Sequence, residues 1–170
     1  MSEIKGCASA LLLFLVSGVH CLATETAWEP FPEQSQIEEI SRADQLEGVV
    51  FLVMEQDEEA LNWVLPRVLH YTRQLREKWK KLNIVVLSHG DEMFALQTEL
   101  KGLHEGLHSL AEQLVSEHDI QIQVCGSYAF FSDISASAFP NYIDVVPSAP
   151  AEIENYRLMG FKMVNLELTW

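Results

Sequence analysis

Three short stretches of the 170-residue sequence, in two groups, carry residue types at spacings that could do chemistry. HEGLH, at positions 104–108, fits the H-E-x-x-H pattern, in which two His side chains on a helix bind Zn²⁺ and the Glu activates water. The second group consists of SHGD at positions 88–91 and CGS at positions 125–127, where two apolar runs end. The first stretch predicts a metal-dependent hydrolase, whereas the second group predicts thiol chemistry.

The residues around HEGLH argue against a catalytic zinc site. Leucines recur at helical spacing across the motif, at Leu100, Leu103, Leu107, Leu110 and Leu114. This stripe should face the sheet, with His104 on its flank, His108 further round and Glu105 almost opposite, so that the motif faces water. The longer zinc pattern needs Gly at position 111 and His at 114, where the chain has Ala111 and Leu114. We expect a solvated helix face and no catalytic metal, with a weak surface metal site through the two His as the alternative.

Five apolar runs of strand length alternate with helical patterns, at positions 48–54, 83–89, 120–125, 142–147 and 162–168. Strands that are apolar throughout are typical of a parallel sheet whose two faces are both covered by helices. Gly160 should end the last helix as its C-cap. The sequence therefore predicts one α/β domain with a mostly parallel, five-stranded sheet.

The carboxyl ends of parallel strands are where such sheets bind ligands. Cys125 lies between a strand end and a helix start, where unpaired N–H groups and the positive end of the helix dipole stabilise a thiolate. His89, at the end of the preceding strand, could pair with that thiolate or hold an anion. We take Cys125 and His89 as candidate catalytic residues, and as candidate ligand-binding residues Gly90, Asp91, Gly126 and Ser127. The alternative is that Cys125 is a small buried hydrophobic residue of the core.

The charge balance excludes one class of partner. The chain has 11 basic and 25 acidic residues, which give a formal net charge of −14. Such a chain repels phosphate backbones and anionic lipids, so we expect no nucleic-acid binding.

The N-terminal region is predicted not to be part of the fold. An apolar run at positions 8–23 follows Lys5 and suits a signal peptide that is cleaved after Ala23, with an uncleaved anchor as the alternative. Residues 24–47 then form an acidic tether with a short helix around 35–43, and the domain spans 48–170. These features predict a periplasmic protein that has no membrane segment after cleavage and keeps one cysteine, Cys125.

The order of the motifs resembles a known family. GVVFLVM, NIVVLSHGDEMFAL, IQIQVCG and YIDVVPSAPAEIENYRLMGF together resemble the DsrE/DsrF-like sulfur-relay family and its YchN-type members, over residues 48–168. The resemblance implies a three-layer α/β/α sandwich that assembles into oligomers, in which the cysteine matching Cys125 carries sulfane sulfur as a persulfide. Ser148 and Ala149 stand where the family often has a Gly, so that loop should differ.

The residues and the resemblance together predict an exported, homo-oligomeric sulfur carrier that needs no cofactor. Its partners would be sulfur donors and acceptors, either small thiols or proteins. The alternative function is a non-catalytic binding or assembly module of the same fold, in which Cys125 is structural.

Overall fold

The computed structural model describes residues 31–167, and within them five strands form a single parallel sheet. The strands are β1 (Gly48–Val53), β2 (Asn83–Ser88), β3 (Ile120–Cys125), β4 (Asp144–Val146) and β5 (Lys162–Leu166). Their order in the sheet is β4-β3-β2-β1-β5, and all four pairings are parallel. The predicted α/β fold with a five-stranded parallel sheet is confirmed.

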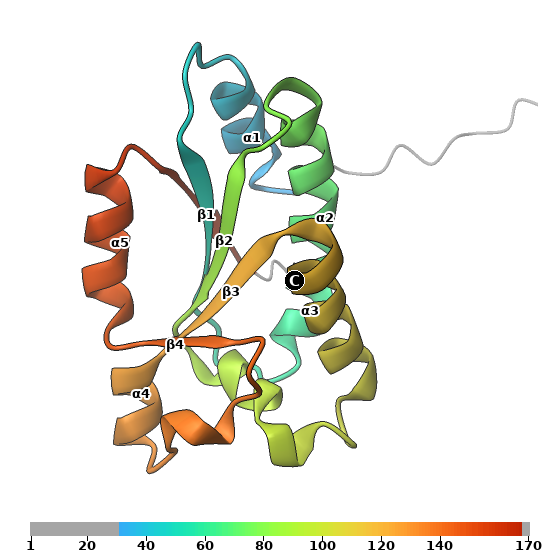
Figure 1. Cartoon of the computed structure of the whole chain (residues 1–170), viewed down its shortest axis with the longest axis vertical. Coiled ribbons are helices and arrows are strands. Elements are labelled where there is room, and N and C mark those ends of the chain that lie inside the picture. The colour runs from blue at the N-terminus through green and yellow to red at the C-terminus, as the bar shows by residue number, and fades with distance from the viewer. Residues whose placement is uncertain (1–30, 168–170) are drawn as a thin grey trace, which may run out of the picture.

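Helices cover both faces of the sheet. They are α1 (Gln34–Ser41), α2 (Ala60–Lys78), α3 (Glu105–His118), α4 (Gly126–Phe131) and α5 (Ala149–Leu158), joined by the 3-10 turns η1 (Asp91–Leu96), η2 (Thr98–Leu100) and η3 (Ala136–Ala138). Figure 1 shows α1, α2 and α3 on one side of the sheet and α5 on the other. The molecule is therefore a three-layer α/β/α sandwich.

Side chains from the central strands point to both helical layers. Phe51 on β1 stacks on Tyr71 of α2, with ring centroids 6.3 Å apart. On the other face, Gln123 of β3 donates a 2.9 Å hydrogen bond to the Tyr156 hydroxyl of α5. The predicted helix end at Gly160 is confirmed, because this residue has a φ of +87°, which glycine adopts without strain.

The short helix α1 is packed onto the domain. Its Ile37 and Ile40 are buried, and the preceding Glu33 forms a 2.8 Å ion pair with Arg67 of α2. These two charged side chains are only 1% and 8% exposed. The predicted signal peptide and residues 24–30 lie outside the part of the chain that the structure describes. No helix between residues 31 and 167 is both long enough and apolar enough to cross a membrane.

Candidate functional site

The parallel register brings the ends of β2 and β3 together. Ser88 pairs with Val124, so the next residues, His89 and Cys125, follow at adjacent strand ends. Tyr128, in α4, connects the two ends: its hydroxyl donates a 2.6 Å hydrogen bond to Asp91, and its ring meets the His89 ring edge-on at 5.5 Å. The structure therefore places the predicted residues at one edge of the sheet, as expected for a parallel α/β fold.

A buried carboxylate fixes the loop that follows β2. Glu92 is fully buried, and its oxygens accept hydrogen bonds from the Ser88 hydroxyl at 2.6 Å and from the backbone N–H of Glu55 at 2.7 Å. The N–H groups of His89 and Gly90 donate to the same side chain at 3.2 and 3.1 Å. Four donors compensate for the desolvation of this carboxylate. Sequence reasoning missed Glu92, although an acid just after a strand-ending His-Gly pair was a signal.

Gly90 permits this close packing of loops. A Cβ atom at position 90 would lie 2.3 Å from both the Glu55 carbonyl oxygen and the Glu92 carboxylate. Gly126 is similarly confined, because a Cβ there would lie 2.9 Å from the Val146 carbonyl oxygen. The two glycines let the ends of β1, β2, β3 and β4 approach each other, and they contribute backbone rather than side chains.

Cys125 lies in a hydrogen-bonded environment under the loop between β4 and α5. The Ala149 N–H, at the start of α5, donates to the Cys125 Sγ atom at 3.3 Å, and Sγ is also 3.2 Å from the Ser127 hydroxyl. The Ser127 N–H in turn donates to the Pro147 carbonyl at 3.1 Å. Both groups near Sγ can donate a hydrogen bond to the sulfur. The cysteine is nevertheless 0% exposed.

His89 does not form the pair with Cys125 that the sequence suggested. Between residues 31 and 167 no hydrogen bond joins the two side chains, and the His89 Nδ1 atom is buried without a hydrogen-bond partner. His89 instead lines a small pocket of about 220 Å³, together with Leu52, Ile153 and Asn165. Cys125 is not among the residues that line this pocket. The strand-end edge thus holds a buried thiol and a neighbouring small pocket.

The expectation that the two His of HEGLH face water is wrong. Helix α3 begins at Glu105, so His104 is its N-cap, and Leu103 precedes the helix with 77% of its surface exposed. The buried residues of α3 are Leu107, His108, Ala111 and Leu114. The leucine pattern counted from Leu100 therefore included residues that precede the helix. For this reason it placed His108 on the solvent-exposed face of α3, whereas the residue is buried.

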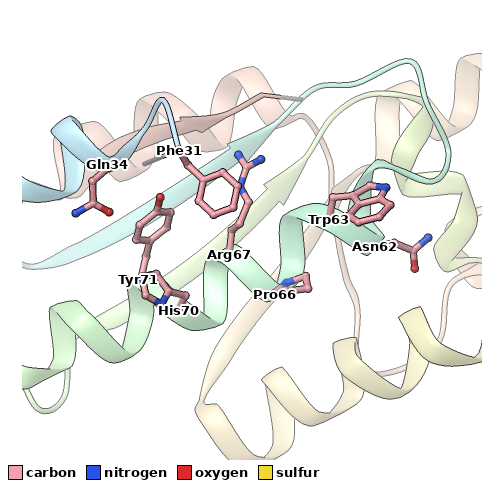
Figure 2. Close-up of a pocket in the computed structure, with 8 residues that line it drawn as sticks. All are labelled: Phe31, Gln34, Asn62, Trp63, Pro66, Arg67, His70 and Tyr71. Carbon is pink, nitrogen blue, oxygen red and sulfur yellow. The ribbon is translucent and has the colours of Figure 1, made fainter. Parts of the chain in front are cut away.

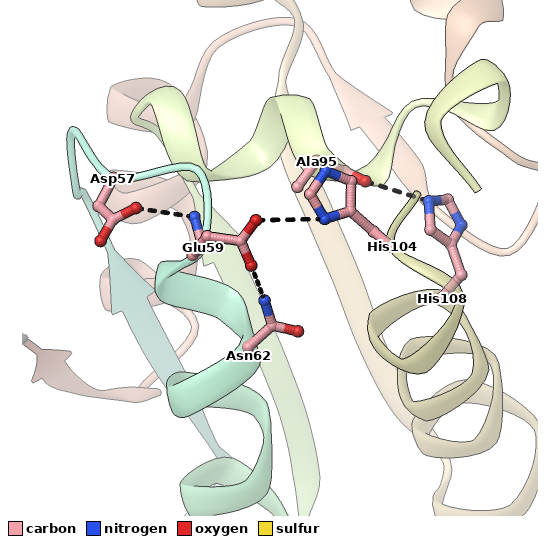
Figure 3. Close-up of polar contacts among 6 residues, drawn as sticks. All are labelled: Asp57, Glu59, Asn62, Ala95, His104 and His108. Carbon is pink, nitrogen blue, oxygen red and sulfur yellow. Dashed lines mark hydrogen bonds and ion pairs between the residues drawn. The ribbon is translucent and has the colours of Figure 1, made fainter. Parts of the chain in front are cut away.

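His108 is a hydrogen-bonded residue of the core. Its Nε2 atom lies 3.1 Å from the Ala95 carbonyl, as Figure 3 shows, and its Nδ1 atom lies 2.6 Å from the Tyr142 hydroxyl. Because a carbonyl only accepts, Nε2 carries the proton of the neutral ring and Nδ1 accepts from Tyr142. Burial lowers the pKa of His108, and it raises the pKa of Tyr142 to about 12, so both stay neutral.

This hydrogen bonding leaves the motif without the ligands that zinc needs. The Nδ1 lone pair of His108 is used by Tyr142, and the His104 Nδ1 atom lies 3.5 Å from a Glu59 carboxylate oxygen (Figure 3). Glu105 is exposed. No group of three His, Cys, Asp or Glu side chains in residues 31–167 is arranged to hold a metal ion. The His side chains of HEGLH stabilise the packing between α3, η1, α2 and the segment before β4.

Comparison with known proteins identifies the fold and no more. No model of a protein family matches the chain, and no curated protein matches it. A solved structure of a protein of unknown function, MTH1491 from Methanobacterium thermoautotrophicum, is similar with a TM-score of 0.53 and 20% identity, over 69% of this chain and 97% of that one. A conserved protein of unknown function, BT1422 from Bacteroides thetaiotaomicron, has a TM-score of 0.49 and 19% identity, over 71% of this chain and 95% of that one.

Proposed function

We propose that this protein is a DsrE-like sulfur carrier in which Cys125 holds sulfane sulfur as a persulfide. The observation that carries the proposal is the pair of donors at the sulfur, the Ala149 N–H at 3.3 Å and the Ser127 hydroxyl at 3.2 Å. Both groups can donate to Sγ when it is the thiolate that attacks the donor and that leaves after transfer. The resemblance of residues 48–168 to the sulfur-relay family supports the same reading.

The transfer needs no cofactor and no outside oxidant. The Cys125 thiolate attacks a sulfane sulfur of a polysulfide or a persulfide donor, and a new S–S bond forms. The donor's S–S bond breaks, and the donor leaves as a thiolate that carries one sulfur fewer. An acceptor thiolate then attacks the outer sulfur of the Cys125 persulfide, and the Cys125 thiolate is the leaving group.

Burial of Cys125 sets a condition on this mechanism. Cys125 is fully covered, and the segment that begins with Pro147 and Ser148 contacts its Sγ atom through the Ala149 N–H, so the carrier requires this segment to move away from the sulfur. Two hydrogen bonds hold this segment near the thiol, from Ala149 N–H to Sγ and from Ser127 N–H to the Pro147 carbonyl. The carrier therefore requires this segment to open locally, without unfolding of the domain.

The same burial favours a second candidate function. A non-catalytic binding or assembly module would keep Cys125 as a structural residue, and its ligand would occupy the pocket of about 220 Å³ beside His89. In this module the thiol reacts only when the whole domain unfolds, whereas in the carrier it reacts after local opening. The reactivity of the thiol in the folded protein therefore distinguishes the two candidate functions.

Polysulfide treatment of the native protein tests the proposal. Intact-mass analysis should show added sulfur atoms that a reductant removes, and Cys125→Ser should abolish the addition. Ser127→Ala should slow it, because one donor to Sγ is lost. Native protein that takes up sulfur on other residues, or none at all, contradicts the carrier and leaves the binding module.

We also propose that the mature chain is exported to the periplasm and assembles with copies of itself. N-terminal sequencing of protein recovered from periplasm should give Thr24 as the first residue, and light scattering should give more than one chain per particle. Cell-derived protein that retains Cys7 contradicts the cleavage.

A further inference from the structure

A second cavity lies between the start of α1 and the outer surface of α2. Its volume is about 690 Å³, and aromatic and apolar side chains form much of its wall, including Phe31, Trp63, Pro66 and Tyr71. Figure 2 shows Tyr71 and Arg67 projecting from α2 toward Phe31. Cavities that bind small molecules have volumes of roughly 300–1,000 Å³ and are mostly apolar with a few polar groups. The size and lining of this cavity match that description.

The charges of the two ionic side chains next to the cavity, Arg67 and Glu33, compensate each other. The Arg67 guanidinium forms a 2.8 Å ion pair with Glu33, lies 4.7 Å from the centre of the Phe31 ring and donates to the Glu167 carbonyl at 3.2 and 3.3 Å. Its positive charge is therefore neutralised within the protein. The formal charge of −14 on the whole chain also disfavours an anion.

Tyr71 contributes its ring to the cavity wall, whereas its hydroxyl is occupied within the protein. Burial and the nearby Glu33 charge raise the pKa of its hydroxyl, which therefore keeps its proton. The hydroxyl is fully buried beside Glu33, and this carboxylate is the acceptor within reach of its proton. The polar groups of Tyr71, Glu33 and Arg67 are thus compensated within the protein, and the cavity offers a ligand mainly apolar and aromatic surface.

From this lining we propose that the cavity is a binding site for a neutral, ring-bearing apolar molecule. The rings of the ligand pack against Trp63, Pro66 and Phe31. The site lies on the α2 side of the sheet, whereas Cys125 contacts α5 on the opposite side. Ligand binding here is independent of sulfur transfer.

A fluorescence titration of the full chain with N-phenyl-1-naphthylamine, a neutral two-ring probe, tests the site. We expect saturable binding of one probe per chain. Trp63 is 63% exposed, so Trp63→Ala should leave the fold intact, yet it should weaken binding about tenfold or more because an aromatic wall is lost. Gln34→Trp, which fills the cavity from α1, should weaken binding as well. Leu103→Ala, which removes an exposed apolar side chain elsewhere, is the matched control and should bind as the wild type does.

Two results would overturn the proposal. One is absence of saturable binding, or binding that neither Trp63→Ala nor Gln34→Trp changes. The other is probe binding that appears only after Trp28→Ala or Trp170→Ala, because a side chain of this chain would then occupy the cavity. Thermal melts of every variant should coincide with that of the wild type, which separates loss of the site from loss of the fold.

Discussion

The Tyr142 hydroxyl donates a 2.6 Å hydrogen bond to the Nδ1 atom of His108, and this contact explains the second His of HEGLH. Through its other nitrogen, the same ring donates to the Ala95 carbonyl at 3.1 Å. One side chain on α3 therefore holds both the end of η1 and the segment before β4. A pattern that resembles a zinc site is here a support for the loops at the carboxyl edge of the sheet.

Replacement of His108 should destabilise the protein. His108→Ala leaves the Tyr142 hydroxyl and the Ala95 carbonyl without their partner and opens a cavity, so we expect a loss of about 2–4 kcal/mol in the free energy of unfolding. Glu105→Ala, an exposed change in the same motif, should alter it by no more than about 0.5 kcal/mol. Urea unfolding monitored by circular dichroism measures both. Equal, small effects would mean that His108 is not packed as described.

The same ring should make stability depend on pH. Burial lowers the folded-state pKa of His108 below the ordinary value of 6.5; Lys101 and His104 act in the same direction, and the Ala95 hydrogen bond and Glu112 oppose them. The unfolded state therefore binds a proton near pH 6.5 that the folded state does not. The free energy of unfolding should rise with pH through this range, level off above it and fall as pH drops below it. His108→Gln, which cannot titrate, should flatten this dependence, whereas an unchanged slope would contradict the assignment.

Two glycines should respond oppositely to the same substitution. Gly90→Ala places a Cβ 2.3 Å from the Glu55 carbonyl oxygen, so the loops must separate and we expect a loss of about 3 kcal/mol or more. Gly106→Ala, in α3, meets nothing within 4 Å and should stabilise the protein by up to about 1 kcal/mol. Thermal unfolding of the two variants checks the signs. A stable Gly90→Ala protein would mean that the loops after β1 and β2 are not in contact.

Glu92 should be intolerant of even an isosteric change. Glu92→Gln replaces one acceptor oxygen with an NH₂ group, which then faces backbone N–H donors, either that of Glu55 or those of His89 and Gly90. We expect a loss of about 2–4 kcal/mol, because two donors cannot satisfy each other. Glu99→Gln changes an exposed carboxylate and serves as the control. Equal melting temperatures for the two variants would show that the buried network is not required.

The sheet could be predicted from sequence because its strands are buried on both faces and are therefore apolar throughout. The predicted fourth strand was too long, because residues 142–147 were expected and only Asp144–Val146 pair with another strand. This strand lies at the edge of the sheet and has a single neighbour, β3. The helix end at Gly160 was predictable because a positive φ has a local residue signature.

The contacts that build the site could not be predicted in the same way. His108 is held by Tyr142, 34 residues further along the chain, and no local pattern links the two. The face on which His108 lies depends on where α3 begins, and the leucines at 100 and 103 suggested a start several residues too early. The parallel register of β2 and β3 places His89 and Cys125 at one edge of the sheet, as the sequence predicted. The burial of Cys125 could not be predicted, because it involves a contact with Ala149, 24 residues further along the chain.

The rate at which iodoacetamide labels Cys125 in the native protein, measured by peptide mass spectrometry across low denaturant concentrations, tests the sulfur-carrier proposal most directly. If labelling required unfolding of the whole domain, it would be slower than that of a free thiol by more than about 10³-fold. The rate would then rise with denaturant with the slope of global unfolding. The carrier requires local opening of the segment that begins with Pro147 and Ser148, so we predict faster labelling that is nearly independent of denaturant. Labelling that follows global unfolding would contradict sulfur transfer and establish Cys125 as a structural residue.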